Sequence, residues 1–143
     1  KKGILVLNEI ACTLGENTPD TAIAILKTAL EKGEQLNYKE GMGECLLTLG
    51  ELSNHKSEYS AALSYLFRAV KLFEQLETEG YKSAEKKRGE ALGGIGIAYD
   101  NRGNFPEALK YYISALKLAE KIKDNDQRGK NLLNRLTLVI KVF

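Results

Sequence analysis

Residues 89–120 read GEALGGIGIAYDNRGNFPEALKYYISALKLAE, and this stretch decides the fold of the chain. In its first half, apolar and small residues recur every three or four positions, which places them on one helical face: Leu92, Ile95, Gly96 and Tyr99. Turn residues follow at 101–104, with Gly103 at the natural left-handed position. Pro106 suits the first turn of a second helix, where its missing N–H would have no partner anyway. The stretch predicts two helices joined by a tight turn.

The second helix carries an apolar stripe of its own, made of Ala108, Leu109, Tyr112, Ala115 and Leu116. Small residues occur on both helices, with Gly96 on the first and Ala108 and Ala115 on the second. They let the two backbones approach closely, while aromatic rings fill the space beside them. Because neither helix can bury its apolar face alone, the stretch predicts an antiparallel helical hairpin.

The hairpin pattern recurs along the chain, and such repeats indicate a solenoid. An earlier unit matches this one at helix-contact positions, with Gly50, Tyr59, Ala62, Leu66 and Ala69 in place of Gly96, Phe105, Ala108, Tyr112 and Ala115. A still earlier unit supplies Ala22, Leu26 and Ala29 in place of Ala62, Leu66 and Ala69. In the forward direction, Gly89 and Leu92 align with Gly129 and Leu132. Several matches in one register favour a true repeat over chance.

The second and third units resemble the tetratricopeptide repeat, and the match rests on two runs of residues: Leu49, Gly50, Tyr59, Ala62, Leu66 and Ala69, then Ile95, Gly96, Tyr99, Phe105, Ala108, Tyr112 and Ala115. The pattern departs from the family at Ser53, where an aromatic residue is usual, and at Glu74 and Glu120, where proline is usual. The periods of 40 and 46 residues exceed the family's standard of about 34. This length is similar to that of the longer-helix subgroup, common in bacterial signalling proteins and adaptor scaffolds.

The resemblance implies an all-α fold, a right-handed superhelical stack of antiparallel helix hairpins with three hairpins and one C-terminal helix. Within a single domain over residues 1–143, we expect repeats at 3–36, 39–77 and 83–122, with a partial fourth unit at 126–143. The last unit ends in LTLVIKVF, which is more apolar than the polar outer face of a terminal repeat. Either the chain is a fragment that continues past Phe143, which we favour, or this surface mediates self-association with a second copy.

Local signals place the ends of the first helices. The first helix is expected over 3–14, with four residues facing inward: Leu7, Ile10, Ala11 and Leu14. Thr18 and Ser57 are the expected N-caps of the helices that follow them. Cys12 and Cys45 both lie in apolar helical stretches, so we expect buried reduced thiols, with a disulfide or a metal site as the alternative.

Composition and charge exclude several classes of partner. A hydrophobic fraction of 43% and a charged fraction of 28% are typical of an ordinary folded domain. The net charge of +2 gives no reason to expect nucleic acid or a membrane surface as partner. No apolar run approaches a membrane span of about 18 residues, and we expect a cytoplasmic protein. The basic connection at 77–88 is either a solvated helix extension or a docking site for an acidic partner.

No residue pattern predicts catalysis, a metal or a cofactor. His55 is the only histidine, and no Cys, Asp or Glu cluster at metal-ligand spacing accompanies it. Without a nucleophile beside a general base, no catalytic residue can be assigned, and we expect no enzyme activity. The glycines at 41–43 and 93–96 complete no phosphate-binding motif. Close helix contact, or an open groove, explains them better.

The function is therefore expected on a surface. In stacked helical hairpins, the first helix of each pair lines a concave groove. By the family geometry, this groove holds eleven candidate protein- or peptide-binding residues: Asn8, Glu44, Leu47, Glu51, Asn54, Glu90, Ile97, Asp100, Asn101, Lys130 and Leu133. Family members that clamp a terminal carboxylate use Lys, Asn and Arg, whereas this chain carries Glu44, Glu51 and Glu90 at such positions, which disfavours a carboxylate clamp.

An acidic rim over an apolar floor predicts a ligand segment with basic and aliphatic side chains. The alternative is that the acidic residues only solvate the inner face. Reversing both Glu51 and Asp100 to lysine is expected to change the capture of a basic ligand and to leave the melting temperature nearly unchanged.

Two functional hypotheses follow from this surface. The first is a protein–protein or peptide-binding scaffold that uses the concave face. The second is an N-terminal sensory or regulatory region of a bacterial signalling enzyme, a histidine kinase or a nucleotide cyclase, whose catalytic domain lies outside this chain. The full-length reading frame distinguishes the two.

Overall fold

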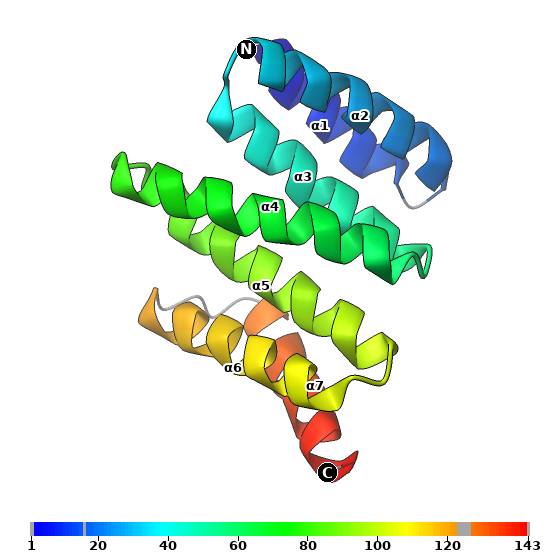
Figure 1. The fold of residues 1–143 in the computed structure, drawn as a ribbon, viewed down its shortest axis with the longest axis vertical. Helices are drawn as coiled ribbons and strands as arrows, with labels where there is room; N and C mark the ends of the chain where they lie inside the picture. Colours follow the sequence, from blue (N-terminus) through cyan, green and yellow to red (C-terminus); the bar gives the residue numbers. More distant parts are fainter. Residues whose placement is uncertain (1, 16, 123–126, 143) are drawn as a thin grey trace.

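Helices account for nearly all of the computed structural model, which describes residues 2–15, 17–122 and 127–142, except for the side chains of 127–132 and 142. The described residues form seven helices and no strand (Figure 1): α1 Lys2–Leu14, α2 Pro19–Gln35, α3 Lys39–His55, α4 Tyr59–Thr78, α5 Ser83–Asn101, α6 Phe105–Lys121 and α7 Gln127–Val142. The predicted helix over 3–14 and the helix start at Pro19 agree with α1 and α2.

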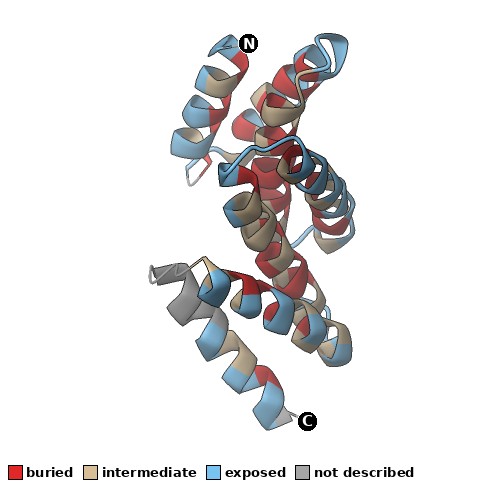
Figure 2. Ribbon diagram, turned by 90° about the vertical axis from the view of Figure 1, so that its left-hand side faces the viewer, coloured by how far each residue is buried: buried red, intermediate tan, exposed pale blue. Residues whose placement is uncertain are grey.

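The helices pack in chain order as a row of hairpins. The pairs are α1 with α2, α3 with α4 and α5 with α6, and each even-numbered helix also packs on the next odd-numbered one. Buried residues lie on the helix faces that meet, and exposed residues lie outward (Figure 2). One core cluster runs from α1 to α5, and a second joins α6 to α7. The predicted all-α stack of helical hairpins is confirmed.

The two layers of the stack are spaced differently. The odd-numbered helices α1, α3 and α5 contact one another directly, α1 with α3 and α3 with α5. Among the described helices, no comparable backbone contact joins α2 to α4 or α4 to α6. Instead, α4 and α6 meet through aromatic side chains. The ring of Phe67 on α4 lies edge to face with the ring of Tyr111 on α6, with centroids 5.9 Å apart. From α1 to α6, the odd-numbered helices are therefore the more closely spaced layer and form the inner side of the row.

Small residues hold the hairpins close, as the repeat pattern predicts. A Cβ atom built on Gly50 would lie 2.4 Å from the Leu66 side chain, and one on Gly96 would lie 2.5 Å from the Tyr112 ring. Ala62 and Ala108 are fully buried at the matching positions of α4 and α6. In each hairpin, the backbone of the first helix at the glycine therefore packs directly against the large side chain of the second helix.

The structure confirms the N-cap position predicted at Thr18, and the N-cap predicted at Ser57 is wrong. Ser57 has a φ of +62°, and the N–H of Glu58 donates to the Ser53 carbonyl, so Ser57 ends α3 in a Schellman arrangement and does not cap α4. Thr18 occupies the N-cap position of α2, but its hydroxyl makes no capping bond and donates instead to the Leu14 carbonyl in the preceding turn. Gly103 has the predicted left-handed conformation, with a φ of +79°.

The inward face of α1 also differs from the prediction. Ile10 is 44% exposed, whereas Ile4, Asn8 and Ala11 are buried. As the first helix of the row, α1 packs only against α2 and α3, so its buried stripe is narrow. The buried face of α1 is centred on Ile4 and Ala11, and Ile10 lies on its outer face.

The two cysteines have opposite environments. Both are free, but Cys12 is exposed, which contradicts the expectation that both are buried. Cys45 is fully buried in the main core cluster. This burial, with a smaller contribution from the Glu44 carboxylate, raises the pKa of the Cys45 thiol to about 11.

Alkylation should therefore distinguish the two thiols. Because the thiolate is the reactive form and the reagent needs access, iodoacetamide at pH 8 should label Cys12 in the folded chain and leave Cys45 unmodified. Mass spectrometry should show a single label before denaturation and two labels after it. Rapid labelling of Cys45 in the folded chain would show that the core around α3 is open.

Candidate functional site

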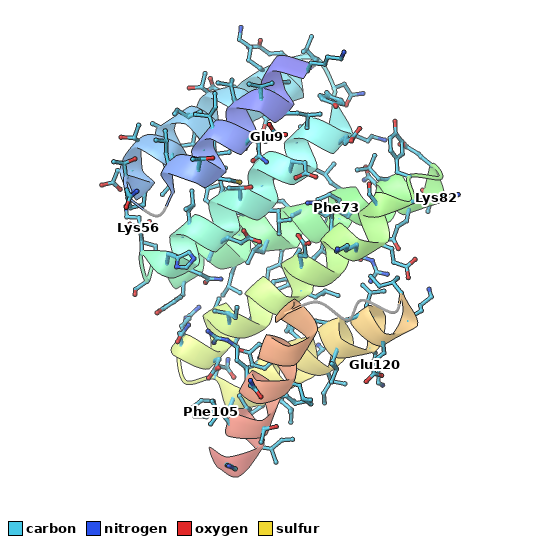
Figure 3. The ribbon with its side chains drawn as sticks, turned by 180° about the vertical axis from the view of Figure 1, so that it is seen from behind. Glu9, Lys56, Phe73, Lys82, Phe105 and Glu120 are labelled. Carbon is cyan, nitrogen blue, oxygen red and sulfur yellow. The ribbon has the colours of Figure 1, made fainter. Side chains whose placement is uncertain are left out.

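The inner side of the stack carries a groove of about 830 Å³. Figure 3 views the molecule from this side, where α3, α5 and α7 follow one another. α3, the turn after it and the first residue of α4 supply one wall, α5 supplies the floor, and α7 supplies the other wall. The lining residues are Glu51, Asn54, His55, Ser57 and Tyr59 from the first wall, Gly89, Glu90, Gly93, Gly94, Ile97 and Asn101 from the floor, and Asn134, Arg135 and Leu138 from α7.

The structure brings together part of the predicted set in this groove: Glu51, Asn54, Glu90, Ile97 and Asn101. Other predicted residues do not line it, and two of them are almost inaccessible, since Asn8 is 7% and Leu47 3% exposed. Glu44 lies farther along α3, where it pairs with a lysine of α5. The side chain of Lys130 lies outside the described residues.

The register of α7 decides which of its residues reach the groove. Gly94 of α5 packs on Leu66 of α4, and Arg135 of α7 contacts Tyr112, the residue that matches Leu66 in the next hairpin. The repeat alignment of the sequence, with its offset of 40 residues, pairs Gly94 with Asn134. The contacts instead make Arg135, one residue later, the counterpart of Gly94. This shift brings Asn134 and Leu138 to the groove and leaves Leu133 exposed beside it.

A side-chain amide joins the first wall to the floor. The Asn54 Nδ2 atom donates to the Gly94 carbonyl over 3.0 Å. Its Oδ1 atom is buried and accepts no hydrogen bond from the described residues. The Asn54 amide thus fixes α3 against α5.

Acidic side chains gather where α3 and α5 face each other. The Lys87 ammonium lies 3.5 Å from the Glu44 carboxylate and 3.9 Å from that of Glu90. Burial raises the pKa of the Glu44 carboxyl, and the nearby Lys87 offsets part of this effect. Glu44 and Glu90 thus both lie beside the Lys87 ammonium, and Glu51 of α3 lines the same groove as Glu90.

The basic side chains of the 77–88 segment, which includes the start of α5, are partly paired inside the chain. Arg88 donates through Nε and Nη2 to the two carboxylate oxygens of Glu77, at 2.6 and 3.1 Å. Lys87 is occupied by the acidic residues described above. These ion pairs support the interpretation of this segment as a helix extension more than as a free docking patch.

Asp100 has a structural role that the sequence did not reveal. Its carboxylate accepts a hydrogen bond from the Tyr112 hydroxyl at 2.9 Å and lies 3.6 Å from Nη1 of Arg135. Tyr112 is fully buried, and this burial raises the pKa of its hydroxyl. Asp100 therefore ties α5 to α6 and α7, so reversing its charge should also lower stability, unlike the expectation from the sequence.

The described residues include no group of His, Cys, Asp and Glu side chains that could hold a metal ion. None of the described helices is long and apolar enough to cross a membrane. His55 lies exposed at the end of α3, on the wall of the groove.

Consecutive hairpins, small-residue contacts and an inner groove define the chain as an α-helical repeat protein. The tetratricopeptide repeat family model matches residues 91–126, which cover most of α5 and all of α6. Over these residues the chain therefore matches a tetratricopeptide repeat, a motif whose carriers generally serve as protein-interaction scaffolds. No curated protein matches the chain.

Proposed function

We propose that the chain is a scaffold module that binds an extended segment of another protein in the groove between α3, α5 and α7. The repeat family supports a role in protein interaction. One observation carries the proposal further: a groove of about 830 Å³ on the inner side, with polar and apolar side chains from three separate helices. Protein–peptide recognition commonly uses such a surface, where a few pockets select alternate side chains of the ligand.

The lining chemistry supports a ligand with basic and aliphatic side chains. Glu51 and Glu90 lie on the side of α3 and α5, while Ile97 and Leu138 provide apolar surface from α5 and α7. Lys and Arg side chains of a ligand suit this combination of acidic and apolar surface, because their aliphatic stems pack on apolar surface while the charged heads reach a carboxylate. Leu138 is 61% exposed and so offers apolar area that a ligand would bury.

Neutralising the two acidic residues should weaken such binding. A displayed library of short random peptides, selected on the wild-type chain, should enrich peptides that combine Lys or Arg with an aliphatic residue. For a selected peptide, the double variant Glu51→Gln/Glu90→Gln should bind about tenfold more weakly, because two partly exposed ion pairs contribute up to about 1 kcal/mol each. Fluorescence polarisation measures the change in Kd.

The matched control is Glu31→Gln/Glu120→Gln, which removes the same charge from exposed positions on α2 and α6. This control should bind the peptide as the wild type does. Equal binding by all three proteins, or no enrichment of basic peptides, would rule out the acidic groove as the binding site.

The regulatory alternative uses the same groove. In that case, ligand binding would be transmitted through α7 to a kinase or cyclase domain elsewhere in the natural protein. Leu133, Leu138 and Ile140 leave α7 with an exposed apolar surface, which supports an attachment there, including the predicted self-association. A reading frame without such a catalytic domain would remove this alternative.

A further inference from the structure

Arg135 is a groove residue that the acidic-groove proposal does not use. Arg135 lines the groove from α7 and Glu51 lines it from α3. The α5 helix lies between these two helices (Figure 3). A ligand with basic groups alone would bring like charge toward this guanidinium, and like charges facing each other weaken binding. The groove therefore carries acidic side chains where α3 and α5 line it and a basic side chain where α7 lines it.

Among the described residues, the contacts of the guanidinium are all made through its Nη1 atom. Nη1 lies 3.5 Å from the Tyr112 hydroxyl and 3.6 Å from the Asp100 carboxylate. The Tyr112 hydroxyl in turn donates to Asp100, so a buried side chain fixes this anchoring point. Nε and Nη2 make no hydrogen bond or ion pair with the described residues, and the side chain is 40% exposed.

The contacts of Nη1 partly fix the orientation of the guanidinium and leave the N–H donors of Nε and Nη2 at the groove. A guanidinium carries five N–H donors in a fixed plane, and two adjacent donors match the two oxygens of a carboxylate. Because Asp100 and Tyr112 hold the third nitrogen, part of the ordering cost is met before a ligand arrives. Asn101 and Asn134 lie exposed on the same groove and can bond to the main chain of a ligand.

We propose that the groove selects a protein segment of mixed charge, in which a Lys or Arg faces Glu51 and Glu90 and an Asp or Glu carboxylate faces Arg135. Ile97 and Leu138 contact an aliphatic side chain between the two charged groups. This inference rests on the proposed function and makes Arg135 the specificity-determining residue of the groove.

The test is peptide selection on matched variants. Random displayed peptides are selected in parallel on the wild type, on Arg135→Gln, on Arg135→Lys and on Lys117→Gln, which removes a positive charge from an exposed position on α6. The wild type and Lys117→Gln should enrich basic and acidic residues within the same peptide. Arg135→Gln should lose the acidic enrichment and keep the basic one, whereas Arg135→Lys should keep part of both, because a lysine retains charge without the planar fork.

A second measurement changes the peptide and leaves the protein intact. Converting the acidic residue of a selected peptide to its amide should weaken binding to the wild type about tenfold and leave binding to Arg135→Gln unchanged. This double-mutant cycle isolates the contact from any shift of α7. Circular dichroism melting checks that Arg135→Gln is folded.

The outcomes separate the two proposals. Basic enrichment that depends on Glu51 and Glu90, without acidic enrichment, would overturn the mixed-charge inference and leave the scaffold function standing. Acidic enrichment of equal strength on Arg135→Gln would also overturn it. Absence of any groove-dependent enrichment would reject the proposed function together with this inference.

Discussion

The Tyr112→Ala variant is expected to lose about 3–5 kcal/mol of unfolding free energy, the cost of removing a buried aromatic side chain. Tyr112 is fully buried, and its ring packs against Gly96 within the α5–α6 hairpin. Tyr112 and Val139 belong to the same core cluster, which joins α6 to α7. Removing the Tyr112 ring should loosen both interfaces, and urea denaturation followed by circular dichroism measures the loss.

Two further variants show which part of Tyr112 matters. Tyr112→Phe keeps the ring and removes the hydroxyl that donates to Asp100, so it should cost about 1–2 kcal/mol. Tyr81→Ala changes an exposed tyrosine in the α4–α5 connection and should stay within about 0.5 kcal/mol of the wild type. A loss below 1 kcal/mol for Tyr112→Ala would contradict the described packing of α6 and α7.

The Gly50→Ala variant should be destabilised by about 1–3 kcal/mol, the usual cost of overpacking. The sign of the change in unfolding free energy is informative, because alanine normally stabilises a helix interior by about 1 kcal/mol relative to glycine. Here the added Cβ would lie 2.4 Å from two carbons of Leu66, a fully buried residue that also packs against Gly94. Neither side chain nor backbone has room to move without disturbing the next hairpin.

The control for Gly50 is another helical glycine in open surroundings. A Cβ on Gly3 would meet no atom within 4 Å, so Gly3→Ala in α1 should be neutral or slightly stabilising. Combining Gly50→Ala with Leu66→Ala should cost less than the sum of the two single changes, since the clash disappears with the leucine. Stabilisation by Gly50→Ala alone would show that α3 and α4 do not approach as closely as described.

Much of the fold follows from local sequence signals. Gly50 and Gly96 recur opposite Leu66 and Tyr112, and this spacing alone indicates helices that touch within each hairpin. The errors arise where an end effect outweighs the periodicity. Ile10 fits an inward stripe by spacing, yet α1 has neighbours only on one side of the row and turns this residue outward.

The helix caps show the limit of residue preference. Serine favours the N-cap position because its hydroxyl can accept a backbone N–H. Ser57 instead adopts a left-handed conformation that closes the preceding helix, a role more often filled by glycine. Nothing in the residue type alone distinguishes these two positions, which are adjacent in the chain.

The groove could be predicted on its α3 and α5 sides and not on its α7 side. Glu51 and Ile97 belong to units with clear repeat matches, so the family geometry assigns them to the inner face. The position of α7 depends on the connection after α6 and on the contact between Arg135 and Tyr112, and neither is visible as a local pattern. Asp100 was misjudged for the same reason, since its hydrogen-bond partner comes from another helix.

The unequal spacing of the two helix layers has a mechanical consequence. Outer helices that meet through rings can slide and tilt, because edge-to-face and offset-stacked aromatic pairs have similar energies. The chain contains both kinds, since Tyr111 meets Phe67 at an interplanar angle of 73° and Tyr99 at 19°. The inner helices α1, α3 and α5 contact one another directly, so a bend of the row would turn about these helices. Small reorientations of Phe67 and Tyr111 would thus translate into a change in the width of the opposite face, where a bound segment would lie.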